Sequence, residues 1–333
     1  MSHSNIALFV PQLGCPHQCS FCNQHRITGQ QSRPTADDVH SAVKTALASG
    51  KCSPSETEIA FFGGSFTAVE KAYQAELLSA AAPYVERGDV SGIRISTRPD
   101  CITPEILSFL KEHKVTAIEL GAQSMDDDVL RQNHRGHTAQ QVASSAALIR
   151  KNGFSLGLQM MTGLFASTPD IDRQTALRLA QLQPDTMRIY PTIVLEDTPL
   201  CDLYRNGAYA PMALEEAVSL CSELLTLFSQ RNIRVIRLGL HSSEELAHAV
   251  AGPYHPAFAE LCYSHCFLQK LTAYLQREHI PPGKWAIGVS PRCLSKAIGQ
   301  GKRNQTALLA LGYDCAFFGD PDLSQEEFRL EKR

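Results

Sequence analysis

The segment IALFVPQLGCPHQCSFC runs from Ile6 to Cys22 and joins a short apolar run to a cysteine-rich loop. The apolar run predicts a buried strand over residues 6–10. Cys15, Cys19 and Cys22 follow with the spacing C-x3-C-x2-C. Cysteine thiolates bind metal, so a site is expected where this first strand ends.

The same succession of a short apolar run and a longer amphipathic stretch recurs along the chain. Further strands are predicted at Glu58–Phe62, Ile93–Ser96, Ala117–Leu120, Leu156–Met160 and Thr186–Tyr190. Helices are predicted at Ala36–Ala48, Val69–Val85, Pro104–His113, Thr138–Lys151 and Asp170–Leu182. Six β-then-α units indicate an α/β protein whose parallel sheet is either doubly wound or curled into a barrel. A helix over Leu214–Gln230 and a possible further strand, Arg234–Leu238, follow.

Unusual residues lie just past the predicted carboxyl end of each strand. They are Cys15–Cys22, Gly63-Gly64-Ser65, Thr97-Arg98, Gln123, Thr162-Gly163 and Tyr190-Pro191. In parallel α/β folds the loops at this edge build the active site. A shared site on one rim is therefore expected.

Length and composition place limits on the class of protein. With 333 residues, 44% hydrophobic and 20% charged, the chain fits a large domain over 1–250 and a small one over 251–333. A net charge of -3 excludes an overall basic protein, so nucleic acid would need a local patch. No apolar run reaches the ~20 residues of a membrane span, and the polar start shows no signal peptide. A cytoplasmic protein is expected, in which the eleven cysteines are thiols.

The three cysteines of the loop match an iron–sulfur cluster with one open iron. Three thiolates hold three irons of a cubane, whereas electron-transfer clusters usually have four cysteines. The alternative is a zinc loop with His17 or His25 as fourth ligand. Structural zinc normally joins two ligand pairs across a longer spacer, and no second pair lies nearby. The sequence favours the cluster.

The cysteine spacing, with Phe21 before the last cysteine, resembles the radical S-adenosylmethionine (SAM) superfamily. The similarity is closest to the radical SAM domain of the Elongator catalytic subunit. Five blocks occur in that family's order: FFGGSFT (61–67), IRISTRPD (93–100), IELGAQS (118–124), RGHT (135–138) and RIYPTIV (188–194). The resemblance implies a partial, TIM-type (β/α)6 barrel with a small C-terminal α/β appendage.

The resemblance also implies the cofactors, a [4Fe–4S] cluster and SAM. The methionine amine and carboxylate of SAM would chelate the open iron. One electron from a flavodoxin or ferredoxin would then cleave SAM to methionine and a 5′-deoxyadenosyl radical, which abstracts hydrogen from an unreactive carbon.

By resemblance, further residues on the rim bind SAM. Gly63 and Gly64 would receive its amine, although Ser65 stands where the superfamily often has an acidic residue. Gln123 and Gln159 would bind the ribose hydroxyls and Arg135 the carboxylate, as in the coproporphyrinogen-oxidase branch. The alternatives are a tight turn for the glycines and a solvated loop residue for Arg135. Thr97, Arg98 and Tyr190 are weaker candidates, with Tyr190 facing either the substrate or the core.

The region beyond residue 250 leaves the β/α pattern. A helix is expected at Ala259–His279, a short segment at Lys284–Phe318, and then a loose charged tail. SKAIGQGKRNQTALLALG (295–312) resembles NusA-type KH modules, whose Gly-x-x-Gly loop clamps single-stranded RNA. Gly299, Gly301, Lys302 and Arg303 fall on that loop, with Lys302 in place of the second loop glycine. The alternative is a polar surface turn ahead of an ordinary helix.

Cys262, His265 and Cys266 on the predicted helix are either a metal site or, more commonly for buried thiols, packing residues. Elongator-type proteins carry an acetyltransferase domain, and the residues beyond 250 show no Arg/Gln-x-x-Gly-x-Gly/Ala pyrophosphate loop of that domain. An acetyl-dependent reaction is therefore not expected of this chain alone.

Three functions follow from the sequence. The favoured one is a radical SAM enzyme that modifies tRNA or rRNA. The second is a radical SAM enzyme acting on a small molecule such as a tetrapyrrole. The third is an RNA-binding or redox-sensing iron–sulfur protein.

Overall fold

The computed structural model describes residues 4–10, 18–23, 33–50, 52–240, 246, 248–325 and 327–333. The chain divides into two compact units, the first made of 1–213 and 227–254 and the second of 214–226 and 255–333. The sequence-based boundary at residue 250 lies near the one at Tyr254. The assignment of 214–226 to the second unit has no counterpart in the sequence-based division.

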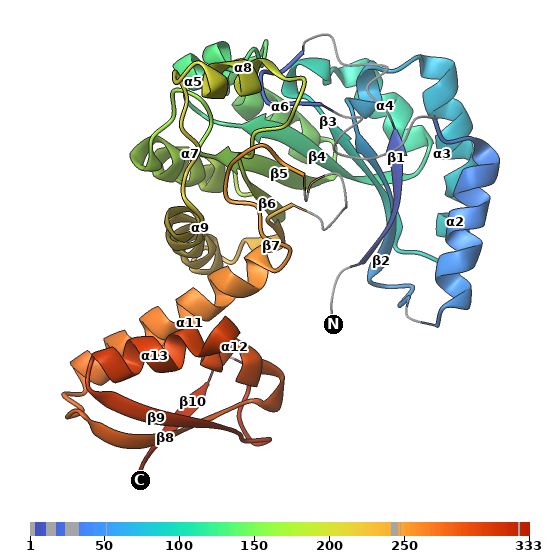
Figure 1. Ribbon diagram of the computed structural model, residues 1–333. Coiled ribbons are helices and arrows are strands. Elements are labelled where there is room, and N and C mark those ends of the chain that lie inside the picture. Colours follow the sequence, from blue (N-terminus) through green and yellow to red (C-terminus); the bar gives the residue numbers. More distant parts are fainter. Residues whose placement is uncertain are drawn as a thin grey trace. The chain divides into compact units, whose positions relative to one another are not determined.

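The first unit is built on one parallel sheet whose spatial order equals its chain order (Figure 1). Its strands are β1 (Ser4–Val10), β2 (Thr57–Gly63), β3 (Gly92–Thr97), β4 (Val115–Gln123), β5 (Ser155–Thr162), β6 (Thr186–Pro191) and β7 (Arg234–Leu238). β1 and β7 are the two edges, so the sheet forms an open, partial barrel. The predicted α/β class and partial barrel are confirmed, and the possible strand at 234–238 makes a seventh.

Helices cover one face of this sheet (Figure 1). They are α2 (Ala36–Ala48), α3 (Lys71–Glu86), α4 (Pro104–Glu112), α6 (Ala139–Lys151) and α7 (Pro169–Gln181). The first unit also contains α5 (Asp127–Gln132) and α8 (Pro199–Arg205), whereas most of α9 (Leu214–Ser229) belongs to the second unit. Several begin at threonines whose side chains accept a backbone N–H of the first turn, including Thr103, Thr138 and Thr168. Proline in the first turn of α4 and α7 strengthens those starts.

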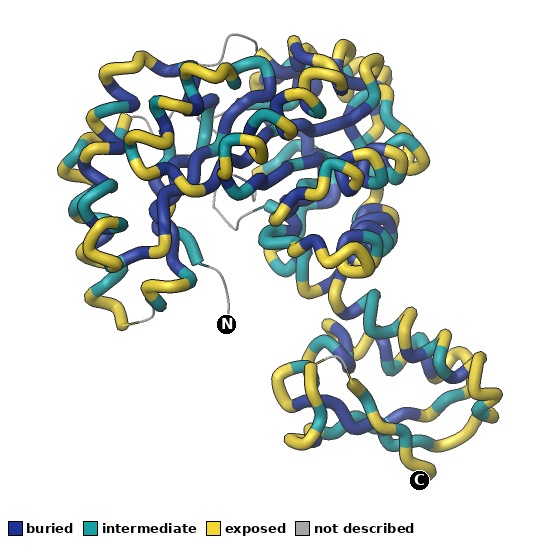
Figure 2. Tube along the Cα trace, turned by 180° about the vertical axis from the view of Figure 1, so that it is seen from behind, coloured by how far each residue is buried: buried dark blue, intermediate teal, exposed yellow. Residues whose placement is uncertain are grey.

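Alternate residues of the strands face opposite sides of the sheet. On β3, Ile93 and Ile95 are fully buried on the helix-covered face, and Ser96 faces the concave side. Figure 2 shows these strands as the buried centre of the unit. Each fully buried isoleucine or leucine stabilises the fold by roughly 1.5–3 kcal/mol. The concave face instead carries polar and charged residues, which build the site.

The second unit is a small α/β structure. It contains α11 (Phe258–Arg277), β8 (Gly283–Val289), α12 (Leu294–Ile298), α13 (Arg303–Ala310), β9 (Tyr313–Gly319) and β10 (Phe328–Lys332). The sheet order is β10-β8-β9, with β8 and β9 parallel and β10 antiparallel to β8. The predicted appendage is confirmed. The expectation of a loose tail was wrong, because Phe328 and Leu330 pack against the unit's core and form β10.

Candidate functional site

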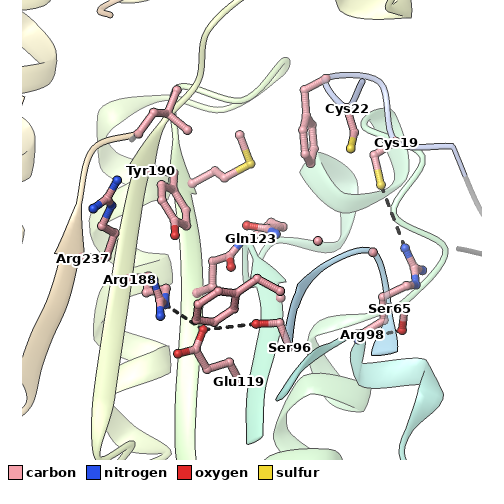
Figure 3. Close-up of a pocket in the computed structure, with 18 of the residues that line it drawn as sticks. Cys19, Cys22, Ser65, Ser96, Arg98, Glu119, Gln123, Arg188, Tyr190 and Arg237 are labelled. Carbon is pink, nitrogen blue, oxygen red and sulfur yellow. Dashed lines mark hydrogen bonds and ion pairs between the residues drawn. The ribbon is translucent and has the colours of Figure 1, made fainter. Parts of the chain in front are cut away.

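A cavity of about 540 Å³ lies on the concave face of the first unit, at the carboxyl ends of the strands (Figure 3). Residues from all seven strands and from the cysteine loop line it. Of the predicted site residues, the cavity brings together Cys19, Cys22, Gly63, Gly64, Gln123, Arg135 and Gln159. Thr97, Arg98 and Tyr190 line it as well. The structure therefore brings these residues to one cavity on the rim, whereas Thr162 and Gly163 do not line it.

The cysteine loop is held to the loop before α6. Ser20 donates its backbone N–H to the carbonyl of Asn133 (3.1 Å) and its hydroxyl to the Asn133 side chain (2.8 Å). Cys22 N–H donates to Cys19 O (3.2 Å), which turns both side chains toward the cavity. These bonds fix the direction of two of the three predicted cluster ligands.

The remaining predicted metal ligands are not all described. Cys15 lies outside the described residues, as do His17 and His25, the alternative zinc ligands. Within the described ranges, no three His, Cys, Asp or Glu side chains are grouped to bind a metal. The complete three-cysteine set stays a prediction.

Two buried arginines surround the sulfur of Cys19. Arg135 donates from Nη1 to Cys19 Sγ (3.0 Å) and from Nη2 to the carbonyl of Gly121 (2.6 Å). Arg98 places Nη1 4.0 Å from the same sulfur and pairs with Asp100 at 2.9 Å. Arg135 is only 5% exposed, so it is not a solvated loop residue. The Cys19 sulfur thus lies between two guanidinium groups that are shielded from water.

Gln123 is turned into the cavity by an irregularity in β4. The register passes from Gly121 opposite Gln159 to Gln123 opposite Met160, and Gln123 takes a left-handed φ of 64°. Its Oε1 is buried without a hydrogen-bond partner in the described structure, as is Arg135 Nε. Unsatisfied buried polar atoms are costly, and here they point to a ligand.

The glycine turn after β2 is required by close packing. Gly63 has φ 115°, and a Cβ there would lie 2.3 Å from the carbonyl oxygen of Val10. Gly64 N–H donates to that same oxygen (3.0 Å). The turn therefore joins the ends of β1 and β2. Ser65, which follows, bonds to the hydroxyl of Thr97 (2.8 Å).

A buried network of charges, two members of which line the cavity, was not anticipated from the sequence. Arg94 pairs with Glu58 (2.6 Å) and with Glu119 (3.3 Å), and Glu119 pairs with Arg188 (2.7 Å). Arg188 also stacks over the Phe62 ring at 4.6 Å. Burial lowers the pKa of Arg188, but the Glu119 carboxylate and the Tyr190 hydroxyl together outweigh burial and the net direction is upward. The only sequence signal was a single charge within each of four apolar runs, those of β2, β3, β4 and β6.

In the second unit the glycine-rich loop lies between α12 and α13. Gly299, Gly301 and Lys302 have φ of 79°, 60° and 64°, all in the left-handed range. Arg303 forms an exposed ion pair with Glu215 (2.9 Å). Asn304 ties the loop down by donating to the carbonyls of Ser264, Lys296 and Ala297.

The Cys262–Cys266 pair shows the contacts of packing residues. Cys262 is fully buried, and Cys266 Sγ donates to the carbonyl of Ser222 (3.5 Å). Burial raises the pKa of both thiols, which disfavours the metal-binding thiolate.

An open parallel barrel whose rim holds cysteine thiols beside buried arginines is an arrangement that suits an enzyme of the iron–sulfur class. The chain matches the family model of the radical SAM superfamily over residues 9–179 and that of the radical SAM C-terminal domain over 184–266. This chain belongs to the radical SAM superfamily. It is thus a radical SAM enzyme, and its cofactors are a [4Fe–4S] cluster and SAM.

Named relatives include the tRNA uridine(34) acetyltransferase of Dehalococcoides mccartyi, 25% identical over 239 residues that cover 62% of this chain and 52% of that protein. Human Elongator complex protein 3 is 34% identical over 152 residues, which cover 44% of this chain and 28% of the human protein. The solved archaeal Elp3 of Methanocaldococcus infernus shares the fold, with a TM-score of 0.63 at 19% identity. The match covers 84% of this chain and 65% of the archaeal one. The chain spans about half or less of the length of these curated relatives.

The site fits these cofactors. The sulfur of Cys19 lies under the Arg135 guanidinium, and the unpartnered Gln123 Oε1 faces the same cavity. No helix in the described ranges is both long and apolar enough to cross a membrane.

Proposed function

We propose that this radical SAM enzyme modifies RNA, with tRNA or rRNA as its substrate. The observation that carries the proposal is the pairing of a cofactor-type cavity with similarity to a tRNA-named relative over 239 residues. The KH-like loop of the second unit supports it. The acetyl transfer in that relative's name is not part of the proposal.

In this proposal Cys15, Cys19 and Cys22 hold the cluster. The cluster and SAM supply a 5′-deoxyadenosyl radical when an electron arrives, from a flavodoxin or ferredoxin in the cytoplasm. Arg135 orients the Cys19 sulfur by its hydrogen bond. Arg135 thus helps to position one of the three cysteine ligands of the cluster.

The remaining cavity residues bind and orient SAM in this proposal. Gly63 and Gly64 place backbone groups beside its amine. Gln123 and Gln159 bind the ribose hydroxyls, and Arg135 offers its unsatisfied Nε to the carboxylate. A guanidinium has five donors, so Arg135 can contact the cysteine sulfur and the carboxylate together.

RNA binding is assigned to the loop between α12 and α13. β8, α12, α13 and β9 follow one another with the loop between the helices, and β8 and β9 pair in parallel. Lys302 adopts the left-handed φ of 64° that suits a glycine, so the loop keeps its turn without the second glycine. Gly299, Gly301, Lys302 and Arg303 would contact the phosphate backbone.

Cofactor cleavage and RNA analysis test the proposal. Anaerobically reconstituted protein with SAM and dithionite should form 5′-deoxyadenosine, more of it when tRNA or rRNA is added. Nucleoside mass spectrometry of RNA from a deletion strain should lose one modified nucleoside. Formation of 5′-deoxyadenosine with an unchanged nucleoside profile favours a small-molecule substrate. No 5′-deoxyadenosine at all favours the redox-sensing alternative.

A further inference from the structure

Three long polar side chains lie side by side on the concave face. Gln159 of β5 is opposite Arg188 of β6, and Arg188 is opposite Arg237 of β7. All three line the cavity. Tyr190 lies two positions beyond Arg188 on the same face. One wall of the cavity therefore presents polar groups from three adjacent strands.

An extra residue in β7 places Arg237 on this wall. Met187 pairs with Val235, and the next residue, Arg188, pairs with Arg237. Ile236 is left without a partner in this register. A β-bulge of this kind re-aims side chains and is common beside active sites. The local irregularity thus brings two arginines next to each other, which costs repulsion unless an anion lies nearby.

The charge of Arg188 is balanced, and that of Arg237 is not. Arg188 pairs with Glu119, which also pairs with Arg94. Glu119 is the only carboxylate among the described lining residues. The side chain of Arg237 is half-buried and has neither an ion pair nor a hydrogen bond with any described residue. Among the residues that the structure describes, this end of the cavity is therefore positive and lacks its own counter-charge.

The unbalanced end lies away from the cysteines. Figure 3 shows Cys19 and Cys22 at one side of the cavity and Arg237 at the other, with Tyr190 next to it. SAM bound at the cysteine side would leave this wall to the substrate. An arginine fork and a tyrosine hydroxyl together match the oxygens of a phosphate.

We propose that Arg237, with Tyr190, binds a phosphate group of the nucleotide that the enzyme modifies. The inference rests on the proposed action on RNA. It makes this wall the part of the cavity that recognises substrate, distinct from the loop of the second unit. A carboxylate would satisfy the same arginine, so the experiment separates the two anions.

The test uses reconstituted protein carrying its cluster and SAM, with uridine 5′-monophosphate, uridine and malonate as probes. Calorimetry should show the monophosphate binding at least about tenfold more tightly than uridine, the usual range for a charge-assisted contact. Arg237→Met should abolish that difference, and Arg237→Lys should restore part of it. Arg234→Met is the matched control on β7, exposed and outside the cavity lining, and should retain the difference.

Equal binding of monophosphate and uridine by the unmodified protein overturns the phosphate site, and so does equal loss in Arg237→Met and Arg234→Met. Malonate that binds through Arg237 more tightly than the monophosphate keeps the anion site but contradicts the proposed RNA substrate. Thermal melting of every variant identifies any that fails to fold. If Arg237→Met fails to fold, the preference of Arg237→Lys for the monophosphate over uridine decides whether the site binds phosphate.

Discussion

Arg135 donates a 3.0 Å hydrogen bond to the sulfur of Cys19, a residue 116 positions earlier in the chain. Both side chains are buried, with Arg135 5% exposed. A buried guanidinium needs an anionic partner, and a thiolate or a cluster sulfur supplies one. Cluster assembly and the ordering of the loop around Arg135 are therefore coupled.

Cys19→Ala and Cys22→Ala should each abolish the brown colour and the iron content of reconstituted protein, because a cubane needs all three thiolates. Iron analysis, together with the visible absorption that arises from charge transfer between thiolate and iron, measures the loss. Cys221→Ala, a buried cysteine outside the cavity, is the control and should keep its iron. About four irons retained in either loop variant would contradict the cluster assignment.

Gln123→Asn should weaken SAM binding on the order of tenfold without loss of iron. The substitution shortens the side chain, so that its carbonyl oxygen, which has no partner as Gln123 Oε1, no longer extends as far into the cavity. Asparagine tolerates the left-handed φ of 64° at this position, so the backbone stays unstrained. Equilibrium dialysis with labelled SAM measures the affinity. Arg131→Ala, an exposed residue of α5, should bind SAM normally, and equal affinities in all three proteins would remove Gln123 from the site.

Arg135→Ala should lower both iron retention and SAM affinity, because its guanidinium bonds to the Cys19 sulfur. Reasoning from sequence alone predicts loss of SAM binding without loss of iron. Iron content measured beside SAM affinity separates the two. Full iron with weakened SAM binding would mean that the sulfur contact contributes nothing to the cluster.

Lys302→Glu with Arg303→Glu should weaken RNA binding and flatten its salt dependence, because phosphate contacts release counterions. The control is Arg277→Glu with Lys284→Glu, which makes the same change in net charge at exposed positions of the same unit. Filter binding of tRNA at low and moderate salt measures both. Equal effects in the two double variants would show attraction by net charge and no site.

The pKa of His137 is lowered to about 4, first by burial and then by the charge of Arg135. Its ordinary value is 6.5. Between these values the unfolded chain takes up a proton that the folded chain does not, so stability falls as pH falls through this window. His137→Gln should reduce the loss between pH 7 and pH 5 by on the order of 1–2 kcal/mol.

Urea unfolding at the two pH values measures this difference. The comparison between unmodified protein and variant isolates His137 from the other histidines. An unchanged pH dependence in the variant would show that His137 titrates normally in the folded protein.

Much of the first unit could be predicted because its signals are local. The apolar runs give the strands, and the rule that loops cluster at the carboxyl edge brings Cys19 and Gln123 together. Arg135 was found only by resemblance, since nothing in RGHT marks it as buried. The SAM-binding roles of these residues stay predictions.

The features that were missed depend on strand register. Glu119 and Arg188 lie in different apolar runs, and only the pairing of neighbouring strands brings their charges to 2.7 Å. The segment RVIRL (234–238) has the sequence pattern of a regular strand, so the unpaired position of Ile236 could not be predicted from it. β10 was missed because Phe328 and Leu330 stand among charges, and their alternation is visible over only five residues.

The unpaired position in β7 means that one extra residue, and not an exchange of residue type, adds a side chain to the cavity wall. Removing Ile236 alone would leave Arg237 opposite Arg188 and would bring the register back to unbroken pairing with β6. The wall would keep both arginines and lose only the Ile236 side chain, which lines the cavity. At this edge strand a deletion would therefore reshape the cavity while every other residue stayed the same.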